Sequence, residues 1–201
     1  MIKLLLLMAF LVFSSFPLKA QTAWKLMRNS NGIKVYTADV ENTKYKSVRV
    51  TCTLQGNYDK LIRILTDVEQ HSDWVYKTKS SKLLKQNSPT DLLYYSEVSM
   101  PWPLDNRDAV VHIVIDKGNL PRFLKIDARS EPNFIAKKEG FIRIPFSHAS
   151  WHVAMVGANH LNIDYTFQIN PGGNVSPWMV NMVADKGPYE SFSKLAEMLK
   201  R

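Results

Sequence analysis

The sequence contains almost no cysteine, since Cys52 is the single one among 201 residues. One cysteine excludes an intramolecular disulfide, so the fold has to be held by its hydrophobic core. Downstream of the N-terminal segment, no apolar run approaches the roughly 18 residues that a membrane-spanning helix needs. The sequence also lacks a Gly-x-Ser-x-Gly elbow, a phosphate-cradling glycine loop and a His-Glu-x-x-His zinc motif. These absences remove the usual signatures of hydrolases, nucleotide-binding proteins and zinc proteases.

The first 20 residues, MIKLLLLMAFLVFSSFPLKA, have the layout of a secretory signal peptide. Lys3 precedes an apolar run from Leu4 to Phe13, and the segment ends at Ala20. This pattern predicts cleavage after Ala20 and export of a soluble chain, most simply to a periplasm. An uncleaved N-terminal anchor is the alternative interpretation.

Removal of that segment leaves 181 residues, 21–201, which is the size of one ordinary domain. The whole chain has a formal net charge of +8, and loss of Lys3 and Lys19 leaves 24 basic residues against 18 acidic ones, or +6. A basic surface could contact an anionic membrane transiently. The basic residues are scattered, however, and secretion argues against nucleic acid as a partner. We therefore expect a monomer with an ordinary solvated surface.

Alternating apolar and polar residues predict antiparallel strands along most of the chain. The clearest examples are SVRVTCTL (47–54) and HLNIDYTFQI (160–169), each with one apolar and one polar face. Gly157-Ala158-Asn159 marks a tight turn that joins the second of these to a partner strand over 150–156. Further strand candidates are 33–37, 80–86, 92–99, 108–116, 122–129 and 141–145.

Two segments have helical periodicity. Residues 57–67 begin with Asn57, a good capping residue, and carry an apolar stripe. Residues 176–200 place Pro177 in the first turn and apolar residues at helical spacings, and Gly187-Pro188 predicts a kink in the middle. The order of elements predicts an α+β protein with a curved sheet around a terminal helix.

The histidines do not predict a metal site or an acid–base pair. His148 and His152 are four residues apart on one strand, about 13 Å along it, and the same spacing separates Asp108 from His112. His71 and His160 are interpreted as surface or capping groups, and Cys52 as a small core residue. We expect neither a metal nor a cofactor.

Three landmarks carry a family resemblance. Asp73-Trp74, Asn106-Arg107-Asp108 after the corner Pro101-Trp102-Pro103, and Pro171-Gly172-Gly173 before Trp178 and Asn181 occur in the order and spacing of a known family. The chain, over roughly residues 25–200, thereby resembles the START family of lipid-transfer domains. The resemblance implies a helix-grip fold, in which an antiparallel sheet grips the long C-terminal helix and encloses a hydrophobic tunnel. It also implies non-catalytic binding, and possible transfer, of a lipid or other hydrophobic small molecule.

One departure from the family concerns the ligand. Cholesterol-binding members tend to carry a buried charged pair in the tunnel, and Ile113 stands where its basic member would be expected. The resemblance therefore does not point to a sterol.

Alternation along the strands and spacing along the helix predict which side chains line the interior. Flexible methionines suit ligands of varied shape. The predicted ligand contacts are Val98, Met100, Trp151, Val153, Met155, Tyr165, Phe167, Met179, Met182 and Val183. Any one of these could equally fill a solid core, and Trp74 and Trp178 are interpreted as packing anchors.

Arg107 is the remaining candidate. It could hydrogen-bond carbonyl or carboxylate groups at the corner and so hold the start of the strand, or it could contact the polar head of a ligand. Two other functions stay open for the whole protein. One is an enzyme of the same superfamily, of the cyclase or hydratase type, with His112 or His152 as its catalytic group if either points inward. The other is a lipid-sensing interaction protein.

Overall fold

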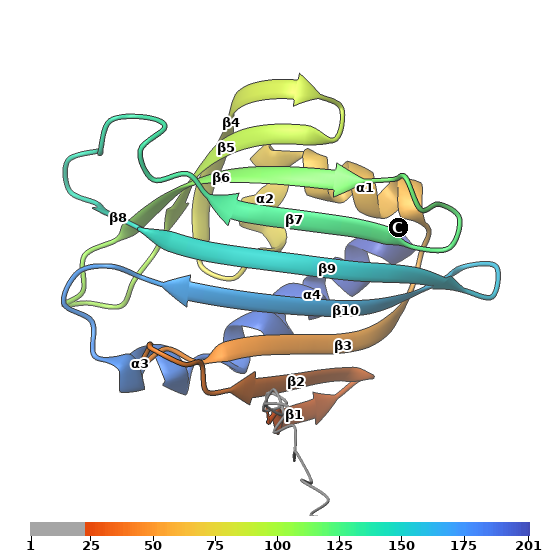
Figure 1. Cartoon of the computed structure of the whole chain (residues 1–201), viewed down its shortest axis with the longest axis horizontal. Helices are drawn as coiled ribbons and strands as arrows, with labels where there is room; N and C mark the ends of the chain where they lie inside the picture. Colours follow the sequence, from red (N-terminus) through yellow and green to blue (C-terminus); the bar gives the residue numbers. More distant parts are fainter. Residues whose placement is uncertain (1–22) are drawn as a thin grey trace, which may run out of the picture.

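The computed structural model describes residues 23–201, so the predicted signal peptide, 1–20, lies outside the described residues. The chain forms one antiparallel sheet with helices on its inner face (Figure 1). The strand order is β1-β2-β3-β10-β9-β7-β6-β5-β4, with β8 beside β6. The sheet does not close, because β1 and β4 remain its two edges.

The strands have the following bounds: β1 Lys25–Ser30, β2 Ile33–Ala38, β3 Ser47–Gln55, β4 Thr78–Ser88, β5 Asp91–Val98, β6 Arg107–Asp116, β7 Leu124–Ser130, β8 Ile142–Arg143, β9 Phe146–Val156 and β10 His160–Asn170. The helices are α1 Tyr58–Thr66, the 3-10 turn η1 Val68–Gln70, α2 His71–Trp74, α3 Pro177–Met182 and α4 Lys186–Lys200. Every predicted strand is present, although β9 begins four residues earlier than expected. β8 is only two residues long and pairs in parallel with β6. The helix-grip prediction is confirmed in its sheet and in its C-terminal helix.

β1 and the α2 region were not among the predicted elements. β1 pairs antiparallel with β2 through Asn31-Gly32, where both residues have positive φ, 50° and 74°. An Asn-Gly pair is a strong hairpin signal, because Asn and Gly tolerate that conformation best. The segment KLMRNS does not alternate in hydrophobicity, so it gave no periodic signal of its own.

The terminal helix breaks at a different place from the predicted kink. α3 ends at Met182, α4 begins at Lys186, and Gly187-Pro188 lies inside the first turn of α4. Proline is tolerated there, because the first N–H groups of a helix have no intrahelical acceptor. A Cβ at position 187 would lie 2.9 Å from Cδ1 of Tyr76, so glycine permits the close approach of α4 to the segment after α2.

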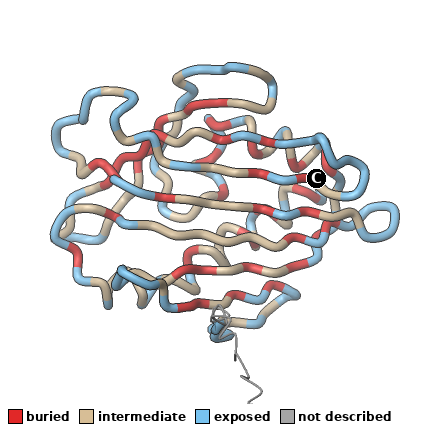
Figure 2. Tube along the Cα trace, viewed as in Figure 1, coloured by how far each residue is buried: buried red, intermediate tan, exposed pale blue. Residues whose placement is uncertain are grey.

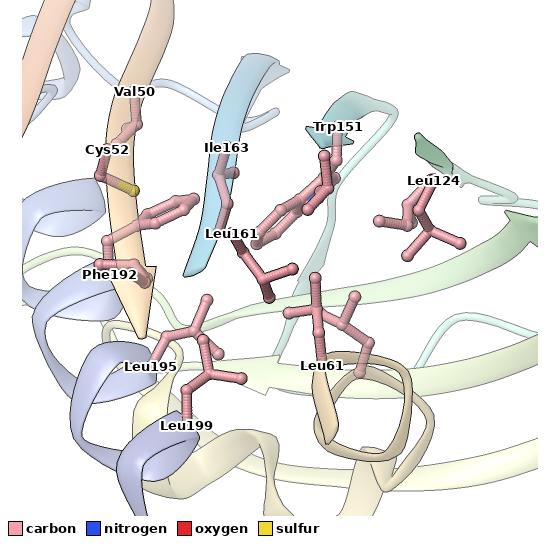
Figure 3. Packing of buried hydrophobic residues seen from close by; sticks show 14 of the residues in the cluster. Val50, Cys52, Leu61, Leu124, Trp151, Leu161, Ile163, Phe192, Leu195 and Leu199 are labelled. Carbon is pink, nitrogen blue, oxygen red and sulfur yellow. The ribbon is translucent and has the colours of Figure 1, made fainter. Parts of the chain in front are cut away.

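The core lies between α4 and the inner face of the sheet (Figure 3). Phe192, Leu195 and Leu199 of α4 are at most 3% exposed and face Cys52 of β3 and Leu161 of β10 (Figure 3). Helix α1 adds Leu61, and its N-cap Asn57 accepts a hydrogen bond from the Lys60 amide, as predicted. Fully burying such a side chain contributes about 1.5–3 kcal/mol, which lets this core replace disulfides.

Candidate functional site

Cross-strand register places five of the predicted ligand contacts on the inner face of the sheet. Trp151, Val153 and Met155 of β9 pair with Tyr165, Ile163 and Leu161 of β10. Tyr165 is in turn opposite Val50 of β3, and Phe167 is opposite Val48. Because alternate residues on a strand share a face, all of these side chains lie on the side that α4 covers.

Aromatic rings meet on this face below α4. The ring centroid of Tyr165 lies 4.7 Å from that of Trp151 and 5.1 Å from that of Phe192, and the Phe167 ring follows at 6.3 Å. Edge-to-face and offset pairs at these separations stabilise one another beyond the apolar area they bury. The strands therefore position the rings of Trp151, Tyr165 and Phe167 side by side, and we call these three residues the aromatic wall. Phe192 of α4 faces them.

Burial changes along this wall. Near α1 the inner side chains are fully buried, with Leu124, Val153 and Leu161 all at 0% exposed. Farther along the strands, toward the corner at Pro101, some inner side chains are buried, including Arg107 and Ala109, while others are only partly covered (Figure 2). We call these residues the open half of the inner face: Tyr94, Val111, Ala128, Ala149, Tyr165, Phe167 and Ile169.

Tyr94 was absent from the predicted site. It lies on β5 in register with Val111 of β6, and its ring centroid is 5.0 Å from that of His71. The sequence could have predicted it, because Tyr94 is four residues from Val98 on the same strand and so lies on the face that Val98 was predicted to share with the interior. Burial raises the pKa of both Tyr94 and Tyr165 well above that of a free phenol, and the nearby Tyr94 phenol raises the pKa of Tyr165 further.

The interpretation of His71 as a surface group is wrong, whereas its contact with the last turn of α1 agrees with the alternative of a capping group. Its side chain is buried on α2, its Nε2 lies 3.1 Å from the Leu65 carbonyl, and its ring also packs edge-on against Trp74, at 5.5 Å. Burial lowers the pKa of His71 to about 4. The imidazole is therefore neutral at pH 7, with Nε2–H donating to the carbonyl. His160, by contrast, is exposed at the start of β10, as expected.

Arg107 and Asp108 start β6, as predicted, but they lie on opposite faces and do not pair with each other. Arg107 is 2% exposed and donates from Nη1 to the Asp105 carbonyl and from Nη2 to the Gly172 carbonyl at 3.4 Å. These carbonyl contacts agree with the structural interpretation of Arg107. Its Nε is buried without a hydrogen-bond partner among residues 23–201.

The other two predicted contacts near the corner are Val98 and Met100. Val98 pairs with Arg107 at the end of β5 and is partly exposed. Met100 lies beyond the strand, where its amide donates to Asn106 Oδ1 at 3.0 Å. The corner is thus held by a hydrogen bond from the Met100 backbone to the Asn106 side chain, and neither Val98 nor Met100 is among the side chains packed against the hydrophobic core.

Helix α3 does not pack into the interior. None of its residues is buried. Trp178 and Met182 are 64% and 63% exposed, and Met179 is partly exposed. Val183, which follows the helix, is 38% exposed. The interpretation of Trp178 as a packing anchor is therefore wrong. The helix is held instead at its edge, where Asn181 accepts from the Lys46 amide and donates to the Lys44 carbonyl, both at 3.1 Å.

Two open cavities of about 220 Å³ each lie outside the aromatic wall. One is lined by residues of the β2–β3 loop together with Phe146 and Ile169, and the other lies between α2 and α4 beside Trp74 and Glu190. Each is smaller than the roughly 300–1,000 Å³ typical of a small-molecule pocket. The continuous lipid-sized tunnel therefore remains a prediction.

The histidines considered for catalysis do not point inward. His112 lies on the outer face of β6 with Nε2 2.7 Å from Asp91 Oδ1, a contact that lowers the pKa of Asp91. His152 is exposed on the outer face of β9 and packs against the Phe123 ring. Residues 23–201 contain no cluster of three or more groups that could hold a metal ion, and no helix among them is long and apolar enough to cross a membrane.

Comparison with known proteins agrees with this architecture. The family model of the START domain matches residues 11–201. The chain belongs to the START family. An uncharacterized protein of Pseudomonas aeruginosa is 30% identical over 175 residues, covering 86% of this chain and 84% of the relative. Phosphatidylcholine transfer protein of Bos taurus is 25% identical over 176 residues, covering 85% and 81%.

Comparison with solved structures also supports the START fold. A fragment, residues 25–204, of a STAR-related lipid transfer protein from Xanthomonas axonopodis superposes with a TM-score of 0.82 at 26% identity, covering 89% of this START chain and 99% of the fragment. The Zhui aromatase/cyclase from Streptomyces matches with a TM-score of 0.53 at 12% identity, covering 76% and 90%. At that identity the likeness to the cyclase concerns the fold alone.

Proposed function

We propose that this START protein binds one hydrophobic ligand, of the lipid class, against the open half of the inner face, and that it does so without catalysis. The observation that carries the proposal is that Tyr94, Tyr165 and Phe167, in the open half of the inner face, are apolar rings left only partly covered. A soluble domain rarely leaves such an apolar surface inside its own fold without something to cover it. The named phosphatidylcholine transfer relatives and the lipid-transfer structure support a lipid over other apolar ligands.

Native mass spectrometry of protein purified from its own host tests this directly. We expect an added mass equivalent to one lipid per chain, identified after solvent extraction. A matched variant, Ala128→Trp, places a large ring on the open half and should displace the ligand while circular dichroism remains unchanged. Protein that carries nothing, and that also binds no apolar fluorescent probe, would contradict the proposal.

We further propose that α3 contacts an anionic membrane during ligand exchange. Its exposed Trp178 and Met182 form an apolar surface, and Lys44 lies beside it, because its carbonyl is hydrogen-bonded to Asn181. Tryptophan is favoured at membrane interfaces, and nearby lysines add attraction to anionic lipids. Transfer between vesicles distinguishes a carrier from a sensor, since a sensor would bind lipid without moving it.

Export is the remaining part of the proposal. It rests on the layout of residues 1–20 and places the mature protein in the periplasm or outside the cell. N-terminal sequencing of the protein from cell fractions should give Gln21 as the first residue in the exported fraction. A chain that keeps Met1 and stays with the membrane pellet would support the uncleaved anchor.

A further inference from the structure

A cavity of about 220 Å³ opens between α4 and the segment that joins α2 to β4, outside the apolar interior. Its lining residues are Trp74, Tyr76, Lys77, Lys186, Glu190 and Lys194. Lys186, Glu190 and Lys194 follow one another at intervals of four residues, so they share one face of α4. Phe192 and Leu195 of the same helix are buried in the core instead (Figure 3). The cavity therefore uses a side of α4 that the proposed lipid site does not.

Positive charge exceeds negative charge around this cavity. Three lysines and one glutamate line it, which is a formal excess of two positive charges. Glu190 Oε1 lies 3.8 Å from Lys186 Nζ. The other two lysines, Lys77 and Lys194, have no acidic partner within 4 Å among residues 23–201. The cavity thus lacks a counter-charge for two of its cations.

Lys77 has a backbone conformation that lysine rarely adopts. Its φ is 59°, in the left-handed region, where glycine avoids the steric cost that a Cβ brings. Strain of this kind is typical of functional sites and persists where the surrounding structure holds it. Here the neighbouring Tyr76 is held beside α4, because its amide donates to Ser191 Oγ at 2.9 Å. A role for the ammonium group accounts for a lysine, and not a glycine, at this position.

The cavity wall also contains a hydrogen-bond donor without an acceptor. Trp74 is 5% exposed, and its Nε1 is buried without a hydrogen-bond partner among residues 23–201. A buried N–H without an acceptor is costly. Because Trp74 lines the cavity, an oxygen atom bound there would lie beside this indole. The lysines and the indole are all donors, so the cavity suits a ligand rich in acceptors.

The size and charge of the cavity favour a small anion with two negative charges. Its volume is below the roughly 300–1,000 Å³ of pockets that enclose a drug-sized molecule, so it suits a compact group. A phosphomonoester has a second pKa of about 6 and therefore carries nearly two negative charges at pH 7, on three acceptor oxygens. Lysine is a common partner of phosphate in proteins. A carboxylate, with one charge, would leave half of the positive excess uncompensated.

We propose that Lys77, Lys186 and Lys194 bind a phosphomonoester group or inorganic phosphate beside Trp74, in a site separate from the apolar interior. Lys77 precedes β4 and the other two lysines lie on α4, so the bound anion joins two elements that are distant in sequence. Because the anion binds the folded chain, it raises the Tm. The phosphate belongs either to a lipid headgroup or to a small soluble compound, and the experiments below separate these sources.

Isothermal titration calorimetry of the full mature chain at pH 8 tests the site with inorganic phosphate and with glycerol 3-phosphate. Sodium chloride keeps the ionic strength constant, and acetate is the control with a single charge. We expect one saturable site per chain for at least one phosphate compound, a Tm that rises with its concentration, and weaker binding of acetate. Acetate that binds as tightly as phosphate would overturn the inference.

The two lysines without an acidic partner are the residues to substitute. Lys194→Ala and Lys77→Gly should each raise the Kd for phosphate about fivefold, as for one exposed charge pair. The double variant should raise it about twentyfold, since independent contributions add in free energy. Lys77→Gly also relieves the left-handed conformation, so without phosphate its Tm should be no lower than that of the wild type. A lysine with a structural role alone would not combine undiminished stability with weaker binding.

Lys200→Ala is the matched control. It removes the same charge from the same helix, but Lys200 does not line the cavity. It should leave the Kd for phosphate unchanged. A rise in Kd equal to that of Lys194→Ala would overturn the inference, because binding would then follow the net charge alone.

Vesicles separate the two sources of phosphate. They contain phosphatidic acid, whose headgroup is a phosphomonoester, or phosphatidylglycerol, a phosphodiester, at equal surface charge. All proteins in this assay carry Trp178→Ala with Met182→Ala, which removes the apolar contact of α3. A preference for phosphatidic acid that Lys77→Gly with Lys194→Ala abolishes assigns the site to a lipid headgroup. Phosphate binding in calorimetry without that preference assigns it to a soluble compound.

Absence of saturable binding for both phosphate compounds, together with no preference for phosphatidic acid, would overturn the inference. A lipid found in the interior by native mass spectrometry would be unaffected by that result. The inference does not rest on the proposed lipid binding, so failure of the phosphate site and failure of the proposed function are distinguishable.

Discussion

Arg143 donates from Nε and Nη2 to the two carboxylate oxygens of Asp108, both at 2.9 Å, with the side chains only 2% and 1% exposed. The short parallel pairing of β8 with β6 places them opposite each other. The same guanidinium donates to the carbonyls of Pro132, Ile135 and Ala136, so it also holds the loop between β7 and β8. Asp108 of the Asn-Arg-Asp motif therefore serves to bind Arg143, a role that the sequence did not specify.

Breaking this buried pair should be strongly destabilising. We expect Asp108→Ala or Arg143→Ala to lower the free energy of unfolding by about 3–5 kcal/mol, because each leaves an uncompensated buried partner. In urea titrations the double variant should lose less than the sum of the two single losses. Arg129→Ala, in the exposed pair with Asp127, is the control and should change stability by no more than about 1 kcal/mol. Strict additivity of the two buried substitutions would contradict the pairing.

His71 should make the protein sensitive to acid. Its pKa is about 4 in the folded state against a usual value of 6.5, so between these pH values only the unfolded chain takes up a proton. Stability is therefore fully present above pH 6.5 and falls by up to about 3 kcal/mol as the pH drops to 4. Urea titrations across this range should show a shallower decline for His71→Gln than for the wild type.

Carboxylates with lowered pKa values, such as Glu97 beside Lys138, also contribute to acid sensitivity. The difference between the wild type and His71→Gln isolates the histidine. His160→Gln is the matched control, since His160 is exposed, and its pH profile should follow that of the wild type. Parallel profiles for wild type and His71→Gln would show that His71 does not stay neutral in the fold.

Gly187→Ala should loosen α4 from the segment after α2. The added methyl group would lie 2.9 Å from Cδ1 of the Tyr76 ring, and the Tyr76 backbone is fixed beside α4 because its amide donates to Ser191 Oγ at 2.9 Å. We expect a loss of about 1–3 kcal/mol in the free energy of unfolding, typical of overpacking. Glu197→Ala, on the exposed side of the same helix, should be near neutral. A stabilised Gly187→Ala protein would mean that the ring moves away freely.

The exposed side chains of α3 should control membrane contact and leave stability unchanged. For Trp178→Ala with Met182→Ala we expect about five- to tenfold weaker binding to anionic vesicles and slower transfer of lipid between them, because apolar area is lost at the interface. Cosedimentation and a fluorescent-lipid transfer assay measure the two effects. Val156→Ala is the control, since Val156 is 49% exposed at the β9–β10 hairpin, away from α3 (Figure 1). Equal losses in the double variant and in Val156→Ala would show that α3 does not make the membrane contact.

Local sequence determined most of the elements of this protein. Alternation specified the faces of β3, β9 and β10, because a strand with one buried face must repeat every two residues. Asn57 specified the start of α1, and Pro101 with Pro103 separated β5 from β6. These signals act over a few residues, so they can be recognised without knowing what each element packs against.

The tertiary structure decided what depends on distant partners. Pairing of β6 with β8 gives Asp108 its partner Arg143, and packing of α2 against β5 buries His71. The position of α4 leaves part of the inner face, including Tyr165 and Phe167, only partly covered. Burial and pKa depend on these long-range contacts, which the spacing of residues along one chain does not encode.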